Sequence, residues 1–151
     1  MAKFDIPFSH SQIAVFEAGL ESPFNDWDKM HVDQGFSWRP QSVSFATLED
    51  GGTLNVEILA RKTFVPDPDS VRSIRVPFRV LKEGVEIASI ISGHVVEIQP
   101  GSYSLYYETG KKGSVVWCRF TFVPDEKSVP QIVRADSGLR PPKTFKMDAA
   151  R

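Results

Sequence analysis

Three histidines and one cysteine are the side chains best suited to acid–base, nucleophilic or metal chemistry: His10, His31, His94 and Cys118. No two histidines stand at the spacing of a metal-binding pair, and the sequence holds no Gly-x-Ser-x-Gly elbow, Walker loop or Gly-x-Gly-x-x-Gly motif. His10 lies between two serines, but neighbours in an extended strand face opposite ways, so a Ser–His pair is not expected. These residues predict no catalytic centre, metal site or bound cofactor.

Cys118 shares an alternating apolar pattern with Val116, Phe120 and Phe122. A free cysteine on such a face is usually an unreactive core residue. Because it is the only cysteine, an intrachain disulfide and a Cys-rich zinc site are excluded. Trp117 points the opposite way, so a second sheet, the C-terminal tail or a partner is expected to cover it.

Five acids and a single base occupy the stretch from residue 17 to residue 33: Glu17, Glu21, Asp26, Asp28 and Asp33, with Lys29. The sequence favours a solvated loop and helix start, where Asp stabilises the helix dipole. The other interpretation is an acidic patch that faces a basic partner. Trp27 lies within the stretch and Trp38 follows it. Such residues are more often core or lid residues, although exposed tryptophan is a preferred interface anchor.

Four bases mark the C-terminal segment from Asp136 onward: Arg140, Lys143, Lys146 and Arg151. They suit either phosphate contact or, more commonly, a solubilising terminus. The whole chain has 18 basic and 19 acidic residues, and this balance argues against direct nucleic-acid binding. The distribution is uneven, since residues 1–50 hold eight acids and three bases.

Strict alternation of apolar and polar residues, typical of half-buried strands, surrounds these side chains. It is clearest over residues 54–60, 74–80, 103–107 and 116–122, and weaker over 11–17, 42–48, 85–91 and 95–99. About eight short strands separated by Gly and Pro turns predict an all-β fold, a single-domain antiparallel β-sandwich. Pro77 cannot donate to a strand ladder, so its strand is expected at a sheet edge.

One short helix and two irregular segments complete the expected organisation. The helix has Asn25 or Asp26 as its N-cap and Gly35 as its C-cap. Two prolines make residues 64–70 a rigid loop. Periodicity ends near Pro124, which predicts a β-sandwich domain over residues 1–124 and an extended or loosely docked C-terminal tail over 125–151.

Length and composition fit one globular domain. The 151 residues are 41% hydrophobic and 25% charged, which argues against wholesale disorder. Apolar runs fall far short of the about 20 residues that a membrane-spanning helix needs, so no membrane span is expected. Asp5 interrupts the N-terminus before the apolar core of a signal peptide could form, which predicts a cytoplasmic location.

A series of short segments resembles a known family in its order and spacing. The segments are residues 8–16 (FSHSQIAVF), 26–27 (DW), 34–36 (QGF), 43–46 (VSFA), 76–80 (VPFRV), 84–90 (GVEIASI) and 100–105 (PGSYSL). Each is common by itself, and the shared order is the specific feature. Over about residues 6–108 the chain is similar to the competence protein J (ComJ) family, also called DNA-entry nuclease inhibitors.

The resemblance implies a small non-catalytic protein that binds and inhibits a NucA-type DNA-entry nuclease, whose divalent metal would belong to the partner. Residues beyond about 124 extend past the expected family length, and this departure also suits an immunity protein against a related nuclease toxin. The resemblance supplies no inhibitory motif. We therefore hypothesise contact through the loop region 17–38, by Glu21, Asp26, Trp27, Asp28, Asp33 and Trp38.

Two other function classes remain open. A small-ligand or carbohydrate-binding sandwich would line an apolar cleft with aromatic side chains: Trp38, Tyr103, Tyr106 and Tyr107. An enzyme on this scaffold would need a histidine and carboxylates in one cavity. The sandwich itself favours none of the three classes, because function lies in sites rather than folds.

Overall fold

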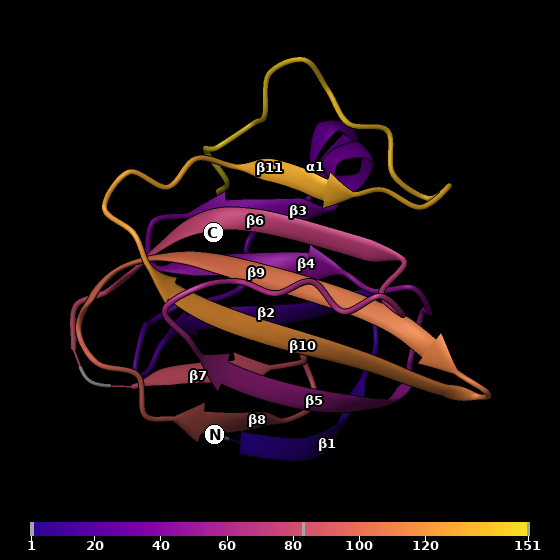
Figure 1. Ribbon diagram of the computed structural model, residues 1–151, viewed down its shortest axis with the longest axis horizontal. Coiled ribbons are helices and arrows are strands. Elements are labelled where there is room, and N and C mark those ends of the chain that lie inside the picture. Colours follow the sequence, from indigo (N-terminus) through magenta and orange to yellow (C-terminus); the bar gives the residue numbers. More distant parts are fainter. Residues whose placement is uncertain (1, 83, 151) are drawn as a thin grey trace.

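Two β-sheets pack face to face in a sandwich (Figure 1). The structure is a computed structural model that describes residues 2–82 and 84–150. The six-stranded sheet has the order β1-β5-β10-β9-β6-β11, and the five-stranded sheet has the order β3-β4-β2-β7-β8. The strands are β1 (Ala2–Phe8), β2 (Gln12–Glu17), β3 (Phe36–Arg39), β4 (Ser42–Ala46), β5 (Gly52–Ala60), β6 (Arg72–Val80), β7 (Val85–Ala88), β8 (Gly93–Val96), β9 (Gly101–Lys112), β10 (Val115–Pro124) and β11 (Gln131–Arg134). The predicted all-β sandwich with one short helix is confirmed.

The eight strands predicted from alternation are all present, and β1, β3 and β11 are additional. The four residues of β3 and of β11 are too few to show a period. One pair of strands differs from the antiparallel prediction: β10 runs parallel to β5, with Val116 opposite Leu54. Alternation identifies strands but not the direction in which distant strands meet, so the sequence could not reveal this pair.

The core lies between the sheets and is built from the inward side chains of the alternating strands. Phe45 of β4 stacks on Tyr107 of β9 with ring centroids 4.6 Å apart, and both rings contact Phe120 of β10. Cys118 is buried on the same face, as predicted, and desolvation raises the pKa of its thiol far above the ordinary value. A thiol held in its neutral form here is a core residue rather than a nucleophile.

The loop that follows β5 covers the outward face of β9 and β10. Phe64 stacks on Tyr106 with ring centroids 3.8 Å apart. A Cβ added at Gly110 would lie 2.7 Å from the Asp69 carbonyl and 2.9 Å from the Trp117 ring, so the loop and Trp117 meet over this glycine. Within the described chain, the cover of Trp117 is therefore this loop, rather than the second sheet or the tail.

Pro77 does not lie in an edge strand, because β11 pairs with β6 on its outer side. That pairing reaches only from Ser73 to Arg75, so among the described residues no strand pairs with β6 on this side at Pro77. The Pro77 carbonyl there accepts a hydrogen bond from the Trp38 indole. Pro77, which has no backbone N–H, therefore lies where no neighbouring strand requires one, although β6 as a whole is an internal strand.

The helix α1 (Lys29–Gln34) begins later than predicted, because Asp28 is its N-cap. The Asn25 side chain is instead buried and donates to the carbonyls of Ser37 and Ser42, at 2.8 and 2.9 Å. Gly35 ends the helix in the left-handed conformation with φ 86°, as expected for a C-cap glycine. Among the described residues no helix is long and apolar enough to cross a membrane.

Residues 125–150 first add β11 to the six-stranded sheet and then pass over α1 and β3 (Figure 1). Leu139 is buried, and the Phe145 ring lies 5.7 Å from that of Phe36. The Gln34 amide donates to the Lys146 carbonyl and accepts from the Lys146 backbone N–H, both at 2.9 Å. The hydrogen bonds between the Gln34 side chain and the Lys146 backbone, together with the apolar contacts, thus hold the segment against the sandwich.

Candidate partner-binding surface

Three of the five acids between residues 17 and 33 are engaged within the molecule. Glu17 is buried, and its carboxylate accepts from the backbone N–H groups of Leu81 and Lys82, at 3.1 and 2.6 Å. Asp28 accepts a hydrogen bond from the His31 backbone N–H at 3.1 Å and pairs with the Lys146 ammonium. The Lys146 hydrogen bond, followed by that from His31, lowers the pKa of Asp28 from 3.8 to about 2. Asp33 pairs with Lys29 one helical turn earlier, at 2.7 Å. The Asp28 and Asp33 carboxylates stabilise the helix and its cover.

Glu21 and Asp26 are exposed, and among the described residues neither forms a salt bridge. The Asp26 backbone is fixed at both ends, since its N–H donates to the Ala150 carbonyl and its carbonyl accepts from the Ser37 hydroxyl. Its carboxylate is therefore presented from a rigid position. These two side chains are the members of the predicted acidic set that are available to a partner.

Both tryptophans of this region are half-buried and anchored. The Trp27 indole N–H donates to the Gln12 side chain at 3.2 Å, and the ring meets His31 edge-on. The Trp38 indole donates to Pro77 at 2.7 Å, while the Trp38 carbonyl accepts from the Ala149 N–H. Trp38 thus joins β3, β6 and the C-terminal segment, as a core or lid residue would.

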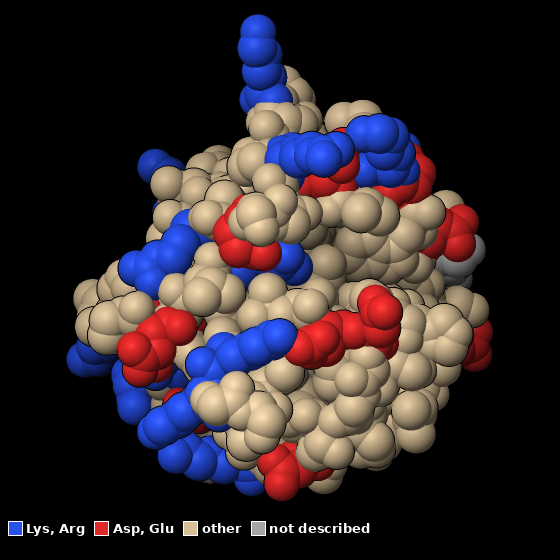
Figure 2. All heavy atoms as spheres, turned by 90° about the vertical axis from the view of Figure 1, so that its right-hand side faces the viewer, with Lys and Arg blue, Asp and Glu red and all other residues tan. Residues whose placement is uncertain are grey.

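The basic residues of the tail have separate environments. Lys146 lies on Asp28, and the Arg140 backbone N–H donates to the Asp33 carbonyl at 2.8 Å. Lys143 is exposed, and Arg151 lies outside the described residues. On the side of the molecule that Figure 2 shows, Asp and Glu side chains are set among the Lys and Arg side chains. This interleaving differs from the continuous basic face that nucleic-acid binding needs.

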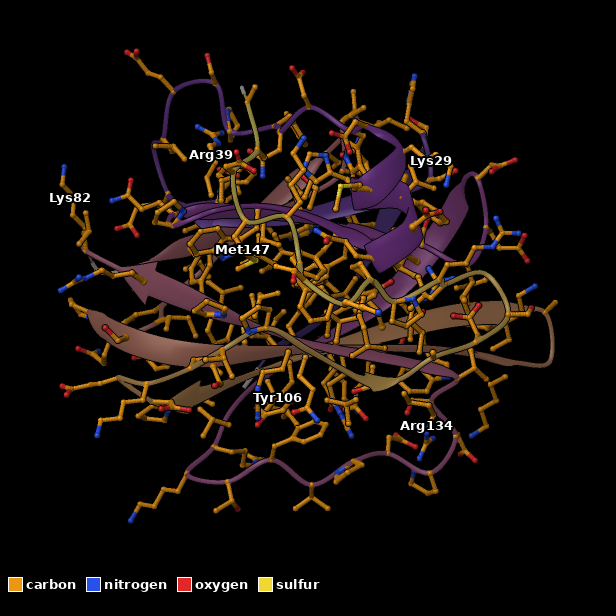
Figure 3. All side chains as sticks on the ribbon, turned by 90° about the horizontal axis from the view of Figure 1, so that it is seen from above. Lys29, Arg39, Lys82, Tyr106, Arg134 and Met147 are labelled. Carbon is orange, nitrogen blue, oxygen red and sulfur yellow. The ribbon has the colours of Figure 1, made fainter. Side chains whose placement is uncertain are left out.

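The aromatic cleft of the ligand-binding alternative is not formed. Tyr103 and Tyr107 point into the core and are buried, whereas Tyr106 faces outward beneath Phe64. Figure 3 shows Tyr106 on the opposite side of the sandwich from α1 and its Lys29. Side chains one residue apart in a strand face opposite ways, so these tyrosines cannot line one cavity.

The Ser9 hydroxyl lies 2.8 Å from His10 Nδ1, contrary to the expectation that these neighbours would diverge. The reason is that β1 ends at Phe8, and His10 takes a turn conformation with φ 59°. The pair is exposed, and His31 and His94 lie elsewhere, in α1 and β8. Within residues 2–82 and 84–150 no three His, Cys, Asp or Glu side chains are grouped to hold a metal ion.

The outer face of the five-stranded sheet carries a groove that the sequence did not predict. Its volume is about 430 Å³, and it lies between the loop after β2 and the turn from β7 to β8. The apolar residues that line it are Phe16, Leu20, Phe24, Ala88, Ile90 and Ile91. The sequence signal is the pair Ile90-Ile91 at a Ser-Gly turn, an unusual place for two large apolar side chains.

The family model of competence protein J (ComJ) matches residues 5–123. The chain belongs to the ComJ family. Among solved structures, it resembles ComJ from Bacillus subtilis, described as an inhibitor of the DNA degrading activity of NucA. The TM-score is 0.71 and the sequence identity 18%, over 83% of this chain and 96% of that one. A second structure, described as crocagin biosynthetic gene J, has a TM-score of 0.56 and 13% identity, over 83% and 97% of the two chains.

No curated protein sequence matches this chain. The ComJ family match ends at Val123, so β11 and the segment that covers α1 lie beyond it. The matched part includes Glu21, Asp26 and the groove on the five-stranded sheet. These candidate contact residues therefore lie within the ComJ part of the chain.

Proposed function

We propose that this protein is a non-catalytic inhibitor that binds and blocks a NucA-type DNA-entry nuclease, or a related nuclease toxin. The observation that carries the proposal is the ComJ family match over residues 5–123. The relative from Bacillus subtilis, described as an inhibitor of NucA, supports the same partner class. The proposal includes the cytoplasmic location expected from the sequence, which cell fractionation tests.

The physical basis of inhibition is competition for a positively charged cleft. A nuclease must attract phosphates, so its DNA-binding surface carries positive potential. Carboxylates on an inhibitor are drawn to the same surface, which raises the association rate and blocks the substrate. We assign the first contacts to Glu21 and Asp26, because their carboxylates are exposed and Asp26 is held by its backbone. Asp28 and Asp33 act by holding α1 in place.

The test is a plasmid-cleavage assay with purified NucA-type nucleases, including the Bacillus subtilis enzyme and those of the source organism. The protein should abolish cleavage at saturating dose and should cleave no DNA when added alone. The double variant Glu21→Ala, Asp26→Ala should raise the inhibition constant several-fold, whereas Asp69→Ala, which removes a carboxylate from the loop over the six-stranded sheet, should not. Full nuclease activity at saturating dose would refute the proposal.

A further inference from the structure

The groove on the outer face of the five-stranded sheet, hereafter the outer groove, presents apolar side chains that no segment of the described chain covers completely. Ile90 and Ile91 are 47% and 60% exposed, and Val95 of β8 is 66% exposed. Phe16, Glu86 and Val95 are register partners across β2, β7 and β8, so their side chains share one face of the sheet. The apolar surface thus extends from the groove to the edge strand.

Both walls of the outer groove are fixed before any partner arrives. In the turn after β7, the Ser89 hydroxyl accepts from the N–H groups of Ile91 and Ser92, each at 3.1 Å, and donates to the Pro7 carbonyl. In the loop after β2, the Arg39 guanidinium donates to the Ser22 carbonyl at 2.7 Å. Exposed isoleucines on a rigid turn lose little conformational entropy on binding, which favours affinity.

The two segments of sequence that form the walls of the outer groove contain carboxylates but no lysine or arginine. The loop and β2 come from the segment between Lys3 and Lys29, and the turn and β7 from the segment between Lys82 and Lys111; neither interval contains a lysine or arginine. Glu86 lines the groove, and Glu21 is exposed on the loop between Leu20 and Phe24. Arg39 enters from β3 and is bound to the loop backbone.

An apolar centre with a charged rim is the arrangement of a specific protein interface. We propose that the outer groove is the docking surface for the basic DNA-binding face of the nuclease, with Ile90 and Ile91 as the apolar anchors. Glu21 and Glu86 meet the lysines and arginines of the partner at the rim. This inference rests on the proposed function and adds the surface through which the protein binds the nuclease.

The experiment measures inhibition of a nuclease that the wild-type protein has first been shown to block. Ile91→Arg places a positive charge against the partner's basic face, and the inhibition constant should rise about tenfold or more. The matched control is Val65→Arg, because Val65 is 74% exposed in the loop over the six-stranded sheet; it should inhibit like the wild type. Circular dichroism and thermal unfolding verify that both variants fold.

A second variant tests the rim separately. Glu21→Gln with Glu86→Gln should slow association about three- to tenfold at low salt and should reduce its dependence on ionic strength. If the wild type inhibits and both the Ile91→Arg and the Glu→Gln proteins inhibit equally well, the docking site is wrong while the proposed function stands. If the wild type blocks no NucA-type nuclease, the proposed function fails and this inference fails with it.

Discussion

Asp28 connects three parts of the molecule through one carboxylate. It caps α1, pairs with Lys146 of the C-terminal segment, and lies beside the loop that carries Trp27. The sequence shows an acid near a helix start, but the partner lies 118 residues further along the chain. Local sequence rules describe caps and helical turns, so they could not predict the pairing of Asp28 with Lys146.

The Asp28 pair predicts a defined acid dependence of stability. Because the pKa of Asp28 is about 2 in the folded protein and 3.8 ordinarily, the pair stabilises the fold above about pH 4 and loses this effect as the pH falls towards 2. Asp28→Asn keeps a capping oxygen but no charge. The wild-type Tm should exceed that of the variant by roughly 1–3 °C at pH 6, and the difference should shrink below pH 4 and be lost as the pH falls through 2. A difference that is constant with pH would contradict the pairing.

Alanine substitutions at Gly35 and Gly113 should differ in their cost to stability, although the two glycines have similar backbone conformations. Both Gly35 and Gly113 have positive φ, 86° and 63°, but a Cβ at Gly35 would lie 2.7 Å from Leu139 and 3.0 Å from Ile74. Gly35→Ala should therefore cost about 2 kcal/mol in the free energy of unfolding, for strain and crowding together. Gly113→Ala should cost about 1 kcal/mol, since nothing lies within 4 Å of its added Cβ. Equal costs in urea unfolding would show that Leu139 does not pack on Gly35.

At the scale of elements, the predictable parts are those with local periodicity. The alternation of Leu54, Val56 and Ile58, for example, is sufficient to identify β5 and the face that it buries. The parallel contact of β5 with β10 depends on how the chain crosses the sandwich, which alternation does not encode. The helix start at Asp28 was displaced because Asn25 is used in a tertiary contact with β3 and β4.

The candidate site was less predictable than the fold, because exposure depends on what covers each residue. Of the six residues expected to meet a partner, four make contacts within the molecule: Trp27, Asp28, Asp33 and Trp38. Ile90 and Ile91, which alternation predicted to lie in a strand, lie in an exposed turn because β7 ends at Ala88. Composition signals where charge gathers but not which charges are already paired.

The C-terminal segment predicts a local rather than a global loss of stability. Truncation after Ser137 removes Leu139 and Phe145 and leaves the buried Gln34 amide without its Lys146 partners. Loss of Leu139 alone should cost about 2 kcal/mol or more. Hydrogen exchange should accelerate in α1 and β3, while β1 and β5 at the other edge stay protected. Arg140→Ala, which alters an exposed side chain, is the control; unchanged exchange in α1 after truncation would show that the segment is not docked.

At the scale of the whole molecule, the protein is a two-sheet sandwich with an apolar groove on the outer face of the five-stranded sheet and a family match that ends before the C-terminal segment. Its net charge of −1 gives little overall attraction to a basic partner. In the proposed function, steering has to come from local charge, and the arginine- and lysine-free segments that form the outer groove are its proposed source.

The most direct test of inhibition by occupation of the substrate cleft is the dependence of the inhibition constant on DNA concentration. Initial cleavage rates of a NucA-type nuclease are measured over a range of both protein and DNA. If the two compete for one surface, the apparent inhibition constant should rise in proportion to the DNA concentration above its KM. An inhibition constant that does not change with DNA, or a nuclease that stays fully active at saturating protein, would contradict the mechanism.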